Sequence, residues 1–513
     1  MQKINSFVKR TGLFLFAAAF VSTANAQFLR TSYLQDVPYS LQMNPAQVPS
    51  HGYFSPILGP VSATMQSNAF GTADIQDMFD KGGDYYKSQD FIDKLKDENK
   101  LNLTMAWDQI AFGWFKDENF FNFSTGTRIS MGATIPKSIF TFMNEMNGTS
   151  FDNETWKRGL NADLAGEHIA MQVYQEIGLG YARKINDKLT VGVKLKGLLG
   201  AANMDFEVKQ MAVNTPSGID IDKVRNLDET FKNVNLDWSK FKDGEYKNDP
   251  TGALQAIRNE VGAHGNASIG VAANGKYSMG GIDWKYATDK QGNNTYINGA
   301  NMNGFKIAGY GLGIDLGATY EVIENLEVTA AVTDLGFISW SKSESKEINV
   351  NMAQTYNLDQ DETTYNADGS VKAYGLYDFA QKVSSNEVVN FDMLQMTETE
   401  GEAYTTSLYT TVALGGQYTL LDDKLVVGAL YTGRFAKPKT ISEITLSGAY
   451  NLSAWANVAL SYSMIQSAGK SFGLGLKLGP LYLGTDYMFF GNSSKCVNFL
   501  AGLSVPLGKG KSF

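Results

Sequence analysis

Hydrophobic and polar residues alternate along residues 310 to 337, which read YGLGIDLGATYEVIENLEVTAAVTDLGF. Leu312, Ile314 and Leu316 fall on one face of an extended chain and the intervening glycines and polar residues on the other, because successive side chains of a strand point to opposite faces. The pattern restarts after the polar turn at residues 323 to 325. It therefore predicts a β-hairpin whose apolar face packs either on a soluble core or on membrane lipid.

The same alternation recurs along the chain, and its connections are short on one side and long on the other. Short polar turns are expected at residues 116 to 119, 185 to 188, 421 to 424, 453 to 454 and 479 to 480. Long polar connections are expected at residues 71 to 100, 135 to 168, 201 to 305 and 342 to 404. With a first strand near 59 to 69 and a last strand near 496 to 507, the count is about fourteen.

Short turns on one side and long loops on the other are typical of outer-membrane barrels. Each strand has ten residues or more, enough to cross the hydrocarbon when tilted, and closure leaves no unpaired backbone edge in lipid. The pattern predicts an all-β fold, a transmembrane antiparallel β-barrel of about 14 strands over residues 59 to 513. A secreted soluble β-protein also fits the alternation. The long loops should face the cell exterior, with Asp187, Glu324 and Asp423 in periplasmic turns.

Residues 1 to 26 have the three parts of a secretory signal peptide. A basic start is followed by the apolar stretch 13 to 21 and by a small-x-small cleavage site that ends at Ala26. We expect export, a mature chain from Gln27, and a location in the outer membrane of a Gram-negative cell, in contact with its lipid.

Charge and composition exclude several classes of function. The chain has 53 Asp and Glu against 44 Lys and Arg, and an acidic exported protein binds nucleic acid poorly, so we expect no nucleic-acid partner. Cys496 is the only cysteine, and the three histidines lack the spacing of a zinc hydrolase. His168 beside Glu167 is the only candidate for a hydrolytic pair and is more readily a residue of the barrel rim. We expect no enzyme, no metal site and no cofactor.

A barrel of this width leaves a lumen that is open or plugged. Residues 27 to 58 precede the first strand and are expected to form the plug. This stretch and its boundary hold five of the chain's 11 prolines, which cannot donate regularly to a sheet: Pro38, Pro45, Pro49, Pro56 and Pro60. A disordered exported tail is the alternative, but the stretch has more aromatic and aliphatic residues than such a tail needs.

The plug carries Asn44-Pro45-Ala46, which resembles the amino-terminal Asn-Pro-Ala motif of the long-chain fatty-acid transporter superfamily. The mature chain is more closely similar to an uncharacterised Bacteroidota branch of that superfamily, through segments such as 333 to 337 and 502 to 508. The resemblance implies a fourteen-stranded barrel with a lumenal plug. It carries over no ligand-binding residue and fixes no substrate, and the superfamily also includes a barrel that carries cargo for a secretion system.

Two functions remain open at this point. The first is a passive channel for hydrophobic or amphipathic small molecules, which would make such a molecule the ligand. The second is a non-transporting surface scaffold or cargo carrier, in which the long loops 201 to 305 and 342 to 404 bind a protein of an outer-membrane or secretion complex.

Strand parity predicts a group of charges inside the lumen. If Ile177 and Leu179 face lipid, Glu176 on the same strand and Lys196 on the next point inward, as does Lys194. Asp315 lies at a similar height on the following strand. Cross-strand neighbours are about 5 Å apart, so we expect a lumenal cluster of Glu176, Lys196 and Asp315. It would brace the wall, hold the plug or select the solute.

Overall fold

The computed structural model describes residues 30 to 508 apart from a set of gaps. The gaps are 57–58, 82–84, 86–87, 148–149, 227–228, 230–231, 234, 238, 241–244, 246–251, 289–291, 293, 303–305, 386–387, 389–394, 439, 454, 466–468 and 487–494. The predicted signal peptide at residues 1 to 26 lies outside the described residues. No described helix is long and apolar enough to cross a membrane.

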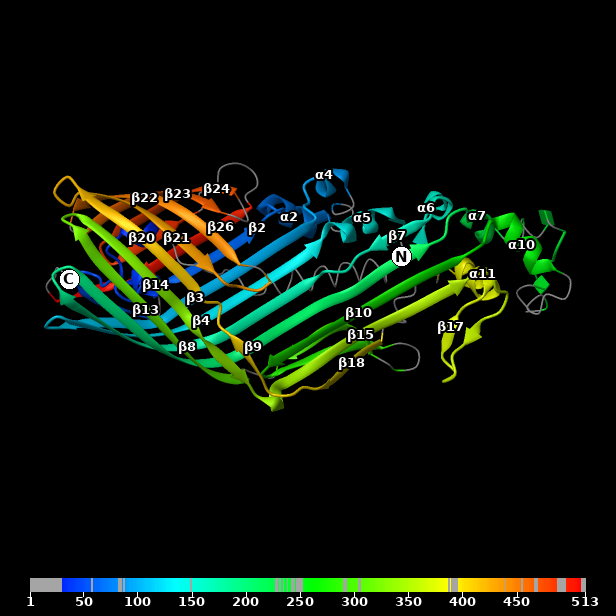
Figure 1. Ribbon diagram of the computed structural model, residues 1–513, viewed down its shortest axis with the longest axis horizontal. Coiled ribbons are helices and arrows are strands. Elements are labelled where there is room, and N and C mark those ends of the chain that lie inside the picture. The colour runs from blue at the N-terminus through cyan, green and yellow to red at the C-terminus, as the bar shows by residue number, and fades with distance from the viewer. Residues whose placement is uncertain are drawn as a thin grey trace.

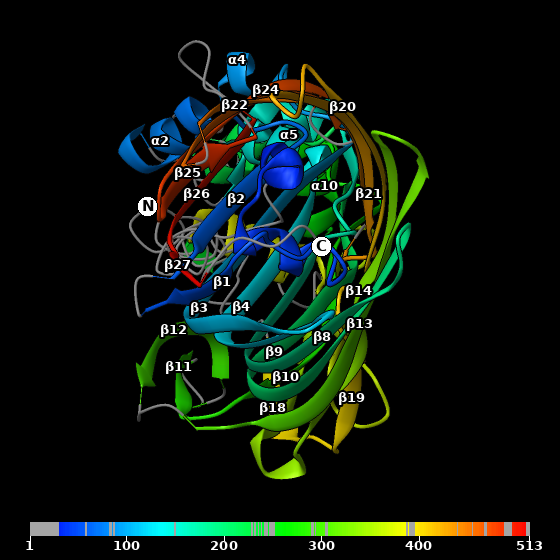
Figure 2. The same ribbon diagram turned by 90° about the vertical axis from the view of Figure 1, so that its left-hand side faces the viewer.

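The described strands close into a fourteen-stranded antiparallel barrel, as the alternation predicts (Figures 1 and 2). In ring order they are β2 (Val61–Ser67), β3 (Glu98–Lys116), β4 (Asn119–Pro136), β8 (His168–Asn186), β9 (Leu189–Thr215), β13 (Gly309–Ile323), β14 (Leu326–Trp340), β20 (Thr411–Leu420), β21 (Leu425–Arg434), β22 (Ile441–Ser453), β23 (Ala456–Ile465), β24 (Gly469–Leu478), β25 (Leu481–Thr485) and β26 (Cys496–Leu503). Each strand pairs with the next, and the pairing of Met65 with Val497 joins β26 to β2 and closes the ring. No strand edge is left to hydrocarbon.

The outward face of the barrel is apolar. Leu179, Leu195 and Leu312 expose 62, 58 and 65% of their surface, whereas the inward-facing Glu176 on β8 and Asp315 on β13 are fully buried. Leu195 pairs with Leu179 on one side and with Ile314 on the other, so the apolar positions line up across strands. Such a belt is what a lipid-facing barrel wall requires.

Tight turns join the strands at one end of the barrel. Asp117 and Asn325 adopt positive φ angles of 56° and 69° in the β3–β4 and β13–β14 turns, as two-residue hairpin turns demand. Residues 421 to 423 do the same between β20 and β21. Aromatic rings stack near this end, with ring centroids 5.6 Å apart for Trp114 and Phe121. Such rings are typical of a membrane interface.

The first strand begins earlier than the sequence predicts. Residues of β1 (Gly52–Ser55) already pair with β3 and with β27 (Val505–Leu507), so β1 and β27 extend the first and last strands. Pro56 and Pro60 interrupt the strand between β1 and β2, which hid its start from the alternation. The predicted boundary of the plug at residue 58 is therefore too late, and the segment before the wall ends at His51.

The wall is much taller on one side than on the other. Strand β9 has 27 residues, whereas β20, β21, β23 and β24 have 10 each. Beyond the barrel the tall wall continues as a sheet of β7 (Leu160–Asp163), β9, β10 (Asn266–Met279), β15 (Ser345–Asn357) and β18 (Gln395–Glu400), which Figure 1 shows to the right of the barrel.

The segments predicted as long polar connections link barrel strands and contain strands and helices of their own. Residues 201 to 305 contain the end of β9, β10, α7 (Ile221–Arg225), α10 (Ala253–Val261) and the hairpin of β11 (Ile282–Thr288) and β12 (Asn294–Met302). Residues 342 to 404 contain β15, β16 (Thr364–Tyr365), β17 (Val371–Ala373), α11 (Leu376–Ser384) and β18. Residues 71 to 100 and 135 to 168 hold the helices α2 (Thr72–Lys81), α4 (Gln89–Ile92), α5 (Lys137–Glu145) and α6 (Asn153–Arg158). These strands were missed because asparagine, serine and acidic residues occupy their polar face and mask the alternation.

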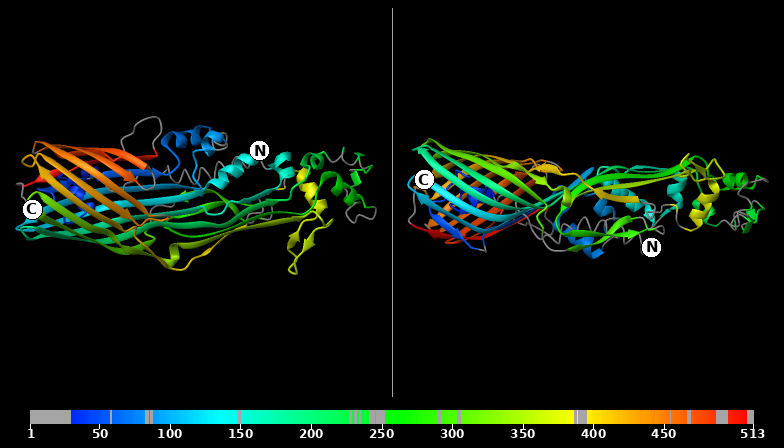
Figure 3. Two further views of the ribbon diagram at one scale, coloured as in Figure 1. Left: turned by 45° about the horizontal axis from the view of Figure 1, so that its top comes forward. Right: turned by 90° about the horizontal axis from the view of Figure 1, so that it is seen from below.

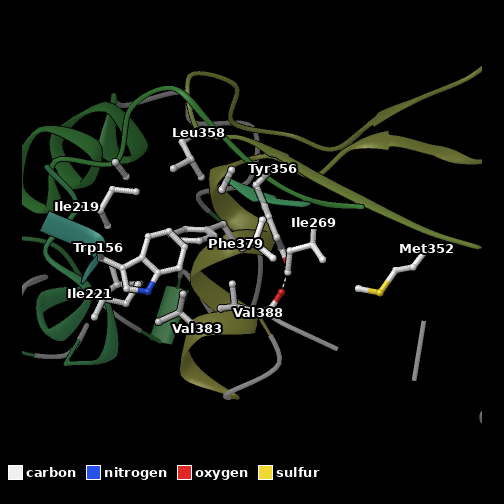
Figure 4. Close-up of a cluster of buried hydrophobic side chains, with 14 of the residues drawn as sticks. Trp156, Ile219, Ile221, Ile269, Met352, Tyr356, Leu358, Phe379, Val383 and Val388 are labelled. Carbon is white, nitrogen blue, oxygen red and sulfur yellow. Dashed lines mark hydrogen bonds between the residues drawn. The ribbon is translucent and has the colours of Figure 1, made fainter. Parts of the chain in front are cut away.

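A compact apolar cluster lies at the end of the tall wall that is far from the barrel (Figures 3 and 4). Trp156 and Tyr356 both meet the ring of Phe379 on α11, with centroids 5.7 and 5.4 Å away. The Tyr356 hydroxyl donates to the carbonyl of Val388 at 3.0 Å. This distal cluster fixes the helices of the tip on the sheet.

Introducing a charged side chain on the outward face tests whether the apolar belt faces lipid. Leu195→Arg should lower the free energy of unfolding into lipid vesicles by about 2 to 4 kcal/mol, because a lipid-facing arginine near the midplane costs that much. Asn351→Arg, an exposed position on β15 beyond the belt, is the matched control and should change the free energy by less than about 0.5 kcal/mol. Equal costs at the two positions would contradict the belt.

Candidate functional site in the lumen

The amino-terminal segment, residues 30 to 49, lies inside the barrel, where Figure 2 shows its short helical turns within the ring of strands. It folds into two 3₁₀ helices, η1 (Arg30–Leu34) and η2 (Pro38–Gln42). All five residues of η1 are buried, and so is the aromatic side chain of Tyr39. A segment with these prolines cannot join the sheet, so it reaches the wall through side chains.

One end of the segment is fixed by a buried group of charges. The Arg30 guanidinium contacts the carboxylate of Glu443 on β22 and lies 3.3 Å from that of Asp486. The backbone amides of Arg30 and Thr31 donate to Asp486 at 2.9 and 2.7 Å, and the Gln66 side chain donates to Glu443 at 2.7 Å. Burying these charges is tolerable because each has an opposite charge and further hydrogen bonds.

Other side chains of the segment contact strands spread around the ring. The Tyr33 hydroxyl lies 3.0 Å from the hydroxyl of Thr329 on β14. The Gln35 amide donates to Asn457 on β23 at 2.7 Å. The segment therefore touches several sides of the barrel and spans the lumen.

The predicted plug motif meets the wall where the wall has glycines. The Asn44 amide donates to the carbonyl of Ala318 at 3.3 Å, and its oxygen accepts from the amide of Ala46 at 2.9 Å. A Cβ atom at Gly317 of β13 would overlap Asn44, and one at Gly192 of β9 would overlap Pro45. These two glycines let Asn44, Pro45 and Ala46 approach the backbone of the wall.

The structure brings the three predicted lumenal charges together. The Lys196 ammonium lies 2.8 Å from Asp315 and 3.5 Å from Glu176. Lys194 lies 2.6 Å from Glu176. All four side chains are buried on the inner face of β8, β9 and β13. Their role in holding the plug or selecting a solute remains a prediction.

Sequence parity missed further members of this group. Asp334 contacts Lys196 at 2.6 Å, and its backbone amide donates to Asp315 at 2.7 Å. Arg128 lies 2.7 Å from Asp108 and 3.4 Å from Glu176. The strand register shifts just after Asp108, and Asp334 has a positive φ of 58°. A prediction that assigns alternate residues of a strand to opposite faces fails across such irregularities. A charged residue inside an apolar run, as in Thr-Asp-Leu at 333 to 335, is the signal that could have found Asp334.

The amino-terminal segment connects directly to this network of charges. The Gln42 amide donates to the Asp108 carboxylate, which in turn pairs with Arg128. A cavity of about 50 Å³ lies between η2 and the network, lined on one side by Tyr39 and Gln42. It has room for a few water molecules, since one needs about 10 to 15 Å³.

Polar contacts also join the strands β8 and β9 to the connections between strands. The Gln172 amide donates to Thr406 at 3.1 Å, and Lys437 contacts the carboxylate of Asp205 above the belt. His168, the predicted rim residue, lies 2.8 Å from Asp205. Burial opposes ionisation of Asp205, but hydrogen bonds from His168 and Lys437 lower its pKa to about 2.

In the described part of the chain, no group of three or more His, Cys, Asp or Glu is arranged to hold a metal ion. The single cysteine, Cys496, is buried. What the lumen offers is a polar cavity lined by charged side chains beside the amino-terminal segment.

Comparison with known proteins assigns the chain to a protein family. Residues 45–486 match a family model described as a family of unknown function, DUF5723. The chain belongs to this family. A search of curated proteins finds no match. The DUF5723 match begins at Pro45, within the plug motif, and covers nearly all of the barrel.

This DUF5723 protein is also similar, at low sequence identity, to solved structures. The Pseudomonas putida toluene transporter TodX is similar at 10% identity and a TM-score of 0.41, over 95% of this chain and 99% of that one. A Pseudomonas aeruginosa FadL homologue is similar at 9% identity and a TM-score of 0.36, over 94% of this chain and 98% of that one.

Whether the buried charges at Arg30 hold the amino-terminal segment in place can be tested by measuring how accessible the segment is to a labelling reagent. Arg30→Gln leaves Glu443 and Asp486 without their cation, which costs about 3 to 5 kcal/mol in buried pairs. The segment should then leave the wall, and a cysteine at the buried Ser40, in a Cys496→Ala background, should react with a maleimide at least about tenfold faster.

The matched control is Arg183→Gln, an exposed arginine on β8. It should leave the labelling rate of the Ser40→Cys protein unchanged. The same slow labelling in the Arg30→Gln protein would show that these charges do not hold the segment.

Proposed function

We propose that this protein is an outer-membrane channel for small amphipathic or hydrophobic molecules and that residues 30 to 49 are its removable plug. One observation carries the proposal: the segment that fills the lumen is held by side chains, at Arg30, Tyr33, Gln35 and Asn44, and not by pairing with the strands. It can therefore leave its place without opening the barrel, whose own backbone pairing is complete.

The lining of the cavity favours amphipathic solutes over purely apolar ones. A solute that passes η2 meets the charged side chains of Arg128, Glu176 and Lys196 before any apolar surface of the distal cluster. Apolar atoms offer such groups no hydrogen bonds, and unpaired buried charges are costly. A molecule with a polar head can replace the water that these groups bind. Export by the predicted signal peptide is part of this proposal.

Uptake into liposomes tests the channel. Protein lacking residues 30 to 49, joined by a short glycine-serine linker, should take up radiolabelled octanoate at least about tenfold faster than the full chain, because the obstruction is gone. Empty liposomes set the background. If octanoate, octanol and a small sugar all fail to enter with either protein, the channel is excluded.

A second function is supported by a different part of the molecule. The tall wall continues well past the lipid belt and ends in the distal cluster, which a minimal channel does not need. The hairpin of β16 and β17 at this end exposes Tyr365 by 63% and Val371 by 39%. A rigid platform of this kind can present a binding surface for another protein, as the scaffold alternative requires.

Photo-crosslinking in intact membranes tests the scaffold. A photoreactive amino acid at Tyr365 should give one discrete adduct of higher mass with a protein partner. The same amino acid at Leu195 in the lipid belt is the control and should give none. A barrel that stays without adduct from Tyr365 under all growth conditions would count against a partner at the tip.

A further inference from the structure

The charges around the lumenal cavity are balanced. Four cationic side chains line it: Arg128, Lys194, Lys196 and Arg434. Each of the first three lies within 3.5 Å of one or more carboxylates, and the carboxylate of Asp334 acts electrostatically on Arg434. Among the described residues the lining includes three carboxylates, and Asp108, which pairs with Arg128, is the fourth. A charged solute would therefore find no free counter-charge in the cavity, which favours a neutral solute.

Three neighbouring threonines of the inner wall have hydroxyls with no hydrogen-bond partner among the described residues: Thr333 on β14, Thr411 on β20 and Thr432 on β21. Each of them is at most 2% exposed. Thr411 lines the cavity, Thr333 is its direct cross-strand neighbour, and Thr432 is its diagonal neighbour on the other side. A buried hydroxyl without a partner is costly, and in native proteins such a group is normally satisfied, if need be by a bound molecule. The wall beside the cavity therefore offers hydroxyls that a solute can use.

The size of the cavity limits what it can hold. Its volume of about 50 Å³ corresponds to roughly three to five water molecules. This is the space of a group with two or three hydroxyls on neighbouring carbon atoms. The rings of Tyr174 and Tyr409 also line the cavity, and the carbon atoms of such a group can pack against them.

We infer that the cavity at Thr411 and Thr333 binds a neutral group with two or three hydroxyls, such as glycerol. A hydroxyl both donates and accepts, so the group can accept from Thr411 or Arg434 and donate to the carboxylate of Asp334. It brings no charge that would be buried without a partner. A free polyol and the polar head of an amphipathic molecule both present this chemistry. The inference names the polar group of a solute for the proposed channel and rests on that proposal.

Binding to the full chain in an uncharged detergent tests the site. Isothermal titration calorimetry with hexylglycerol, hexanol, hexanoate and hexyltrimethylammonium compares four heads on the same tail. We expect hexylglycerol to bind at least about tenfold more tightly than each of the other three, because a site built to hydrogen-bond hydroxyls rejects analogues that lack them. Titration of hexylglycerol in the presence of free glycerol shows whether the polyol competes without the tail.

Replacing threonine by the nearly isosteric valine assigns the binding to the site. Thr411→Val should weaken hexylglycerol binding by about three- to tenfold, as expected for the loss of one neutral hydrogen bond, and Thr333→Val should weaken it as well. Thr411→Ser keeps the hydroxyl and should bind like the natural chain. Thr319→Val is the matched control, since Thr319 is a buried threonine of β13 that does not line the cavity. It should leave the binding unchanged.

The outcomes separate this inference from the proposed channel. Equal binding of hexylglycerol and hexanol, tighter binding of hexanoate, or unchanged binding in Thr411→Val would overturn the inference, and uptake by the chain without its plug would then leave the channel standing. When binding depends on Thr411, competition by glycerol assigns the site to a free polyol and its failure assigns the site to the head of an amphipathic molecule. Binding that depends on Thr411 in a protein that admits no solute would support the site and exclude the channel.

Discussion

The rest of the structure depends on the need to pair every backbone amide and carbonyl in a solvent that offers no hydrogen bonds. A sheet meets this need in lipid only by closing, and β26 closes the ring on β2. A ring of fourteen strands is too wide for side chains alone to fill. The contents of the lumen, namely the segment of residues 30 to 49 and the paired charges, are thus a consequence of closure.

Charged side chains are tolerated inside this barrel because they lie beside side chains of opposite charge. Two such groups lie in the interior among the described residues, one around Arg30 on the side of the short wall and one around Lys196 on the side of the tall wall. The amino-terminal segment reaches both, through Arg30 itself and through the bond from Gln42 to Asp108. Its position is therefore coupled to the charges of the wall, whereas an apolar plug would only fill space. Loss of either group would loosen the segment from one side.

The alternation of inward and outward side chains along each strand accounts for most of what the sequence could predict. It gave the barrel, the short turns, and the inward direction of Glu176, Lys196 and Asp315, because each depends only on a local period of two. It failed where that period breaks: at Pro56, at the register shift after Asp108 and at Asp334. The contact of Arg434 on β21 with Ser130 on β4 was not expected either, since it depends on closure and on no local pattern.

The most direct test of the removable plug is a reversible lock. Asn44 lies so close to Gly317 that a Cβ there would touch it, and a disulfide needs Cβ atoms about 3.5 to 4.5 Å apart. Octanoate uptake should be measured in liposomes with one Asn44→Cys, Gly317→Cys, Cys496→Ala protein, first oxidised and then reduced. We expect uptake in the oxidised protein to be at least about tenfold slower and to recover on reduction. The same rate of uptake in both states would contradict a plug that must move.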